Sequence, residues 1–317
     1  QADDSIILAG AVSTNSISTT VGLNSGVVQI TNIGASALTA DVKNGSLTYI
    51  STGATTLNQV TGGTGSVTIT APSVNDHASD TIADITADTV SITGTSGIGN
   101  SAPVDIASAA GITLIATSGN IDVDHVADAS TTVSNVQTGS GTVTFDQTGN
   151  QALEVTIAST TDGTITFNNT GGSLTLGDVS AGGSGDLALS TITSGNMAVG
   201  GLNAASDDVT LTSAGSITDG NAGTTNITAA NLTFSVGSGG FGSGDSLETV
   251  ISKVEGTSTG GNVEISNSGG ALTIGGIGAA TGVSTSTSGS IVISTAGGVL
   301  TVSEALTAAG SDTVSLT

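Results

Sequence analysis

The side chains of this chain that are best suited to chemistry are carboxylates. Asp122 and Asp124 flank Val123 on an expected strand, so they point to the same face. Asp84 and Asp88 end a run in which aspartates recur at every fourth position from residue 76. Because Ca²⁺ prefers oxygen ligands, one hypothesis is a Ca²⁺ site that includes Asp84, Asp88, Asp122 and Asp124. The absence of an EF-hand loop or a GGxGxDxUx repeat favours the alternative, a solvated acidic surface.

A glycine motif imitates a dinucleotide-binding fingerprint. Gly237, Gly239 and Gly242 form GxGxxG after an expected strand, and apolar residues at helical spacing follow within 246–254. A dinucleotide site requires alternating strands and helices, and no other stretch resembles an amphipathic helix. We therefore interpret the motif as a glycine-rich turn, with a short helix over 246–254 as an alternative.

Residues 256–260 spell GxSxG, the pattern of a nucleophile elbow, which needs a histidine base and an acid on a strand-turn-helix scaffold. The chain has two histidines, His77 and His125, and such a pentapeptide arises by chance in a chain rich in Gly, Ser and Thr. We predict no catalytic residue, no bound cofactor other than the hypothetical Ca²⁺, and no enzymatic activity.

Composition narrows the function further. The 317 residues include 25 acidic side chains, and the two basic ones are lysines, giving a formal net charge of −23. Such a chain offers no counter-charge to nucleic acid or to anionic lipid, which excludes both as partners. Polysaccharide-cleaving enzymes usually combine carboxylates with basic groups and aromatic platforms, whereas aromatic residues make up 2 % of this chain. No apolar run is long enough to insert into a membrane.

These side chains must be carried by strands. Apolar residues alternate with small polar ones in short segments bounded by Gly, Asn, Asp or Ser, which is the pattern of β-strands. The centres of the expected strands are 67–69, 90–92, 112–114, 121–123, 143–145, 155–157, 165–167, 174–176, 187–189, 209–211, 232–234, 263–265, 272–274, 291–293, 300–302 and 314–316.

The spacing of the strands predicts a parallel β-helix, or β-solenoid. Two short strands make a unit of about 21 residues, which fits one coil. Inward Val, Ile, Leu and Thr would form ladders, and Gly and Asn would serve the corners where φ is positive. We expect an all-β fold with one continuous solenoid over residues 1–317, about 15 coils and roughly 70 Å long at about 4.8 Å per coil.

A longer repeat overlies the short one. The segment 85–99 corresponds to 227–242, and 119–123 corresponds to 261–265, with offsets of 142 to 143 residues. We infer tandem module similarity between about 80–125 and 222–267.

Several segments together resemble the repeat region of large secreted bacterial adhesins of the filamentous-haemagglutinin type. The resemblance lies in residues 216–220, 227–229, 240–242, 247–249, 261–263 and 271–275, and it extends over most of the chain from about residue 80. It implies a right-handed parallel β-helix on the bacterial cell surface or in the extracellular matrix. No secretion module of that family is recognisable in this chain.

From these observations we expect a structural, non-catalytic extracellular β-solenoid. It would form a stiff rod, as a segment of a giant surface adhesin or as the subunit of an extracellular fibre. Its partners would be copies of itself, stacked end to end, or the flanking coils of a longer chain. The alternative is a module for Ca²⁺-dependent adhesion to cells or to surface glycans.

Overall fold

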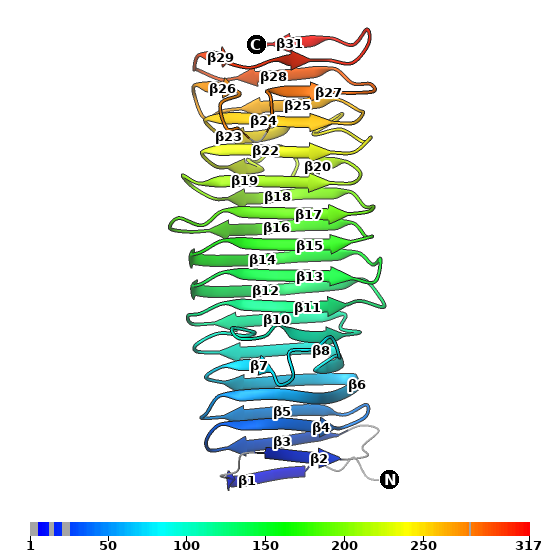
Figure 1. Cartoon of the computed structure of the whole chain (residues 1–317), viewed down its shortest axis with the longest axis vertical. Coiled ribbons are helices and arrows are strands. Elements are labelled where there is room, and N and C mark those ends of the chain that lie inside the picture. Colours follow the sequence, from blue (N-terminus) through cyan, green and yellow to red (C-terminus); the bar gives the residue numbers. More distant parts are fainter. Residues whose placement is uncertain (1–5, 13–15, 21–25, 279) are drawn as a thin grey trace. The chain divides into compact units, whose positions relative to one another are not determined.

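The computed structural model describes residues 6–12, 16–20, 26–278 and 280–317, and all of its regular elements are β-strands (Figure 1). The described residues contain no helix, and therefore none long and apolar enough to cross a lipid bilayer. The chain forms two compact units, Gln1–Gln151 and Ala152–Thr317. Each is built from stacked parallel coils, so the predicted all-β parallel solenoid is confirmed.

The first unit holds thirteen strands, all paired in parallel. They are β1 (Ile6–Val12), β2 (Ser16–Thr20), β3 (Val27–Asn32), β4 (Ser36–Asp41), β5 (Ser46–Ser51), β6 (Thr55–Ala71), β7 (Val74–Asp76), β8 (Ile85–Gly94), β9 (Val104–Ala107), β10 (Gly111–Ala116), β11 (Ile121–Val126), β12 (Thr131–Ser140) and β13 (Val143–Thr148).

The strands of the second unit also pair in parallel. They are β14 (Leu153–Asp162), β15 (Ile165–Thr170), β16 (Leu174–Ala181), β17 (Leu187–Ile192), β18 (Met197–Asn203), β19 (Asp208–Ser213), β20 (Ile217–Asp219), β21 (Ile227–Thr228), β22 (Asn231–Val236), β23 (Leu247–Val250), β24 (Lys253–Ser258), β25 (Val263–Asn267), β26 (Leu272–Ile274), β27 (Val283–Thr285), β28 (Ile291–Thr295), β29 (Leu300–Val302), β30 (Leu306–Thr307) and β31 (Val314–Leu316).

The core of each unit is a narrow space filled by aliphatic ladders. Strand β10 shows why: its side chains alternate between buried and half-buried, so every second residue points inward. The inward residues of successive coils lie in register. In the first unit one such ladder runs through Leu47, Val67, Val90, Ile112 and Val133, all fully or almost fully buried. Parallel in-register stacking thus buries the apolar half of each strand.

Glycine is required where the backbone turns tightly against the coil below. Gly119 follows β10 with φ 79°, and a Cβ there would lie 2.1 Å from the Ser96 carbonyl oxygen. No other residue fits that corner without moving the backbone.

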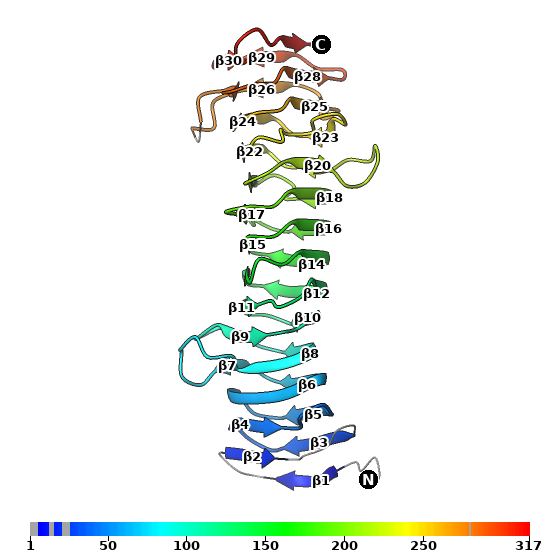
Figure 2. The same cartoon turned by 90° about the vertical axis from the view of Figure 1, so that its right-hand side faces the viewer.

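The number of turns differs from expectation, because the strands make about 13 turns rather than 15. A regular coil is close to the expected length, as where Val90 faces Ile112, 22 residues later. Other coils carry extra residues, as where Val263 faces Ile291, 28 residues later. The extra residues form loops between β7 and β8, between β20 and β21, and between β26 and β27 (Figure 2). We call these loops corner excursions.

The alternative of a short helix over 246–254 is wrong. Leu247 and Val250 lie instead on β23 and Val254 lies on β24, where Leu247 pairs with Ile265 and Val254 pairs with Leu232. Pairing with neighbouring coils therefore overrides the helical spacing of these residues.

Candidate functional site

Three carboxyl groups come together beside the corner excursion of the first unit. One carboxylate oxygen from each of Asp76, Asp84 and Asp105 lies within 4.8 Å of the other two. The side chains of Asp76 and Asp84 are buried, with 7 % and 1 % of their surface exposed, and Asp105 is half-buried. This carboxyl cluster is the strongest concentration of ionisable groups that the described residues contain.

Local structure places each member. Asp76 ends β7 and turns the chain into the excursion: its Oδ1 accepts the Ala78 N–H at 2.9 Å, and its Oδ2 accepts the Asp80 N–H at 3.0 Å. Asp84 ends the excursion immediately before β8, and its Oδ2 accepts the N–H of Asp105, on β9 of the next coil, at 3.0 Å. The cluster therefore fastens both ends of the excursion to the coils.

Burial and mutual repulsion make the cluster resist ionisation. Burial raises the pKa of Asp84 to about 8 against the opposing effect of the hydrogen bond from the Asp105 backbone, and the nearby Asp76 and Asp105 raise this pKa further. Burial also raises the pKa of Asp105 to about 6, assisted by the charges of Asp124, Asp76 and Asp80. Carboxyl groups this close together can share either a proton or a cation. The neighbouring hydrogen-bond donors and charges determine which of the two is bound.

Of the four residues in the Ca²⁺ hypothesis, Asp84 alone belongs to this described cluster. Asp122 and Asp124 lie on one face of β11, as expected, and burial raises the pKa of both. Asp88 is exposed on β8. Asp124 lies in register with Asp105 on one side and with Asp146 on the other, so the carboxylates form a ladder on the outer face.

Asp105 was missed by sequence reasoning, although a signal for it exists. Residues 104–106 align with 247–249 at the same 143-residue offset that relates the two modules. Both segments carry an acidic residue between two inward side chains, Asp105 in one and Glu248 in the other. Extending the repeat comparison along the whole module would have singled out Asp105, although not its contact with Asp84.

The second unit repeats the arrangement with two of the three residues changed. Asp219, Asn226 and Glu248 stand where the first unit has Asp76, Asp84 and Asp105. Asp219 accepts the N–H groups of Asn221 at 2.7 Å and Gly223 at 3.3 Å, and the Glu248 N–H donates to Asn226 Oδ1 at 2.9 Å. Here the Asn226 amide also donates to Asp219 Oδ1 at 2.7 Å.

Isolated bridges beside these loops repeat as well. Ile98 bridges Val74 and Ile121 in the first unit, and Phe241 bridges Ile217 and Val263 in the second. Phe241 belongs to the glycine-rich turn, where Gly240 has φ 85° and Gly242 has φ 63°. Gly242 N–H donates to the Ile217 carbonyl at 2.8 Å, so the GxGxxG segment is built into the coil as a corner.

The GxSxG segment does not present a nucleophile. Ser258 is 1 % exposed, and its hydroxyl donates to the Gly260 carbonyl at 2.6 Å. His77 is exposed in the first excursion, whereas His125 is buried on β11, where its Nδ1 lies 3.0 Å from Gln147 Oε1.

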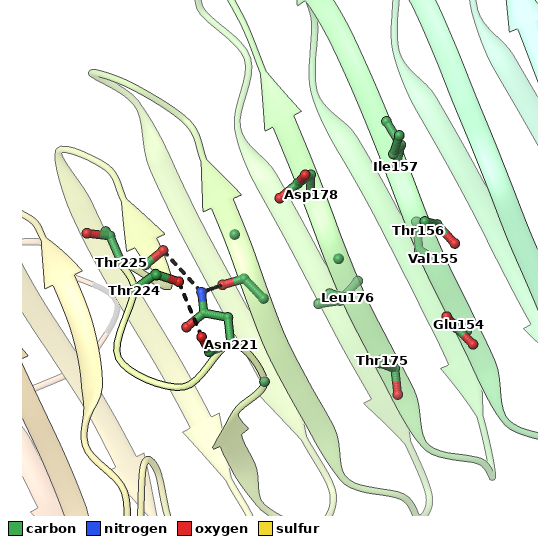
Figure 3. Close-up of a pocket in the computed structure, with 14 residues that line it drawn as sticks. Glu154, Val155, Thr156, Ile157, Thr175, Leu176, Asp178, Asn221, Thr224 and Thr225 are labelled. Atoms are coloured by element: carbon green, nitrogen blue, oxygen red, sulfur yellow. Dashed lines mark hydrogen bonds between the residues drawn. The ribbon is translucent and has the colours of Figure 1, made fainter.

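A shallow open pocket lies on the outer face of the second unit (Figure 3). Strands β14 and β16 supply Glu154, Thr156, Thr175 and Asp178, and the excursion supplies Asn221, whose side-chain amide donates to the Gly200 carbonyl at 2.7 Å. The hollow exists because Gly177, Gly200 and Gly201, which also line it, have no side chains to fill it. Its carboxylates and hydroxyls, without a basic or aromatic side chain among the lining residues, suit a neutral polyol or a cation better than an anion.

Comparison of the chain with models of protein families, with curated proteins and with solved structures found no match. The class that the fold defines is therefore that of β-solenoid repeat proteins.

Proposed function

We propose that this chain is a structural, non-catalytic β-solenoid of the bacterial exterior, a stiff segment of a giant adhesin of the filamentous-haemagglutinin type or the subunit of an extracellular fibre. The observation that carries the proposal is the in-register stacking of buried ladders. In the second unit, one ladder runs through Ile165, Leu187, Val209, Leu232 and Val254 on five successive coils. Bending such a stack would break backbone hydrogen bonds and apolar contacts along its whole length.

The last described coil supports the proposed partner, which is another coil of the same kind. Val314 and Leu316 on β31 lie in register with the buried Ile291 and Ile293 of β28, yet they are 42 % and 38 % exposed. They continue the inward ladders, and their apolar side chains are accessible to a partner. A following coil, either from a longer chain or from a second copy, would cover these side chains and pair with the open edge of β31.

Electron microscopy of the purified chain and of the native material tests this function. We expect narrow rods in which each turn adds about 4.8 Å to the length, and we expect these rods to resist protease. Fibres with a constant axial repeat in native material would identify a polymer subunit, and rods longer than this chain can supply would identify a segment. Compact globular particles, or rapid digestion throughout the chain, would refute the rod.

Cell fractionation tests the proposed location. We expect protease added to intact producing cells to remove the chain from their surface, or the chain to be recovered from the medium. Recovery only after cell lysis would contradict an extracellular role.

A further inference from the structure

In both units, side chains at the two ends of a corner excursion hydrogen-bond to backbone N–H groups, but the residue at the second end differs. In each, an aspartate at the start of the excursion accepts two backbone N–H groups, and a residue at its end accepts one from the next coil. That second residue is Asp84 in the first unit and Asn226 in the second, 142 positions later. The hydrogen-bonding role of Asn226 therefore shows what this position requires.

The orientation of the Asn226 amide is fixed by its partners. Its Oδ1 accepts the Glu248 N–H, so its Nδ2 faces the oxygens of Asp219 and of the Val199 carbonyl, at 2.7 and 2.9 Å. The position therefore needs one acceptor towards the next coil and one donor towards the aspartate. An ionised aspartate can supply only the acceptor.

Asp84 meets the first requirement, since its Oδ2 accepts the Asp105 N–H. One of its carboxylate oxygens also lies within 4.8 Å of an oxygen of Asp76, both of whose oxygens already accept N–H groups from the excursion. Asp76 is thus held as an acceptor, so a hydrogen shared by the two carboxyl groups would be carried by Asp84. We propose that Asp84 is a protonated carboxylic acid at neutral pH, which donates to Asp76 as Asn226 donates to Asp219, and that this proton latches the excursion to the coil.

The charged side chains around Asp84 all favour its protonated form, although the hydrogen bond from the Asp105 backbone opposes it. Asp76 faces it from β7 and Asp105 from β9, and farther out Asp80 in the excursion and Asp124 on β11 add negative charge around Asp105. Strand β6, which pairs with both β7 and β8, carries no ionisable side chain. The raised pKa of Asp84, about 8, agrees with the geometry.

The latch opens with alkali. Because the pKa of Asp84 is higher in the folded chain than its ordinary value of 3.8, folding favours the protonated form. The stabilisation is complete below about pH 4 and is lost as the pH rises through about 8. Once the proton leaves, two buried carboxylates face each other, and the excursion separates from the coil.

Hydrogen exchange of the full chain, followed by mass spectrometry and corrected for the intrinsic pH dependence of exchange, tests the latch. We expect the open population of residues 77–83 to increase about tenfold between pH 7 and pH 9, the change in the ionised fraction of a group with this pKa. Asp84→Asn should remove that increase, and the reciprocal Asn226→Asp should create one in residues 220–225. Asp88→Asn, at an exposed position, is the matched control and should change neither.

Two further measurements use the wild-type chain and so do not depend on the folding of a variant. Infrared spectra of the wild-type chain at pH 7 should show a protonated carboxyl band that disappears by pH 10 and is absent in Asp84→Asn. Millimolar Ca²⁺ should leave exchange of 77–83 at pH 7 the same as in EDTA. Protection by Ca²⁺ that Asp84→Asn abolishes would show that a cation, rather than a proton, occupies the cluster. Uniform loss of stability in Asp84→Asn at every pH would also overturn the latch.

Discussion

Phe234 lies directly against Gly256 in the next coil, and a Cβ at position 256 would lie 2.5 Å from the ring of Phe234. The ring has no room to withdraw, because it is 2 % exposed and stacks on Phe241 with ring centroids 4.3 Å apart. Gly256→Ala should therefore destabilise the second unit by about 1–3 kcal/mol through overpacking. Denaturant unfolding of the two proteins measures the change.

Gly111→Ala is the matched control for that substitution. Gly111 also lies in a strand, but its nearest contact to an added Cβ is 3.7 Å, an ordinary van der Waals distance. We expect the denaturant concentration at the unfolding midpoint of Gly111→Ala to stay close to that of the wild type. Equal losses in the two variants would mean that strand glycines contribute through backbone conformation rather than through the Phe234 contact.

His125 should make the first unit sensitive to acid. It is 1 % exposed, its Nε2 has no hydrogen-bond partner among the residues that the structure describes, and burial lowers its pKa despite the opposing effects of Gln147 and Asp128. A base with a lowered folded pKa stabilises the fold when neutral, and this stabilisation is lost as the pH falls below 6.5. The loss is at most about 1.4 kcal/mol per pH unit.

His125→Leu isolates this contribution. The free energy of unfolding of the wild type, minus that of the variant, should fall between pH 6.5 and pH 5. The acidic groups titrate in both proteins and so cancel from the difference. A difference that stays constant over this range would show that His125 is protonated, or solvated, in the folded chain.

Glu255 should hold the excursion between β26 and β27. Its side chain is fully buried, and its carboxylate accepts the N–H groups of Ile277, Gly278 and Ala280 at 2.5, 3.0 and 2.8 Å. Glu255→Gln replaces one accepting oxygen by an N–H₂ group that opposes these donors. Since hydrogen bonds to a charged group contribute about 1.5–3 kcal/mol each, we expect loss of amide protection at Ile277, Gly278 and Ala280. Glu154→Gln, at an exposed glutamate of the same unit, should leave that protection unchanged.

The open edge of β31 should govern association in solution. Val314→Lys with Leu316→Lys places two charges where a following coil would stack, and should weaken self-association at least about tenfold, or about 1.4 kcal/mol. Sedimentation over a range of concentrations measures this. Val292→Lys is the control, because Val292 is 37 % exposed but points sideways from β28. If all three lysines act alike, association occurs through the lateral face.

Periodicity predicted the strands well because alternation of apolar and polar residues is a local property. All sixteen expected centres lie within strands, from 67–69 in β6 to 314–316 in β31. Periodicity could not predict the burial of polar side chains, because that burial depends on contacts with neighbouring coils. Glu255 is fully buried on its strand, and its carboxylate is held by N–H groups of Ile277, Gly278 and Ala280, which come from the loop of a later coil.

The candidate site was predicted only in part, for the same reason. Asp84 stood out because aspartates recur every four residues, but that spacing also selected the exposed Asp88. Asp76 and Asp105 join Asp84 through the turn at the start of the excursion and through pairing of β8 with β9. Neither contact follows from spacing along the chain.

The corner excursions separate the length of a coil from its stacking. In the second unit, Gly256 pairs with Val283 and Val254 with Ile274, so the residues between β26 and β27 leave and rejoin the same stack. Residues added at such a corner lie outside the stack of hydrogen-bonded strands. The buried ladder of the next turn therefore keeps its register. We therefore expect these corners to accept inserted residues without loss of the stacked strands.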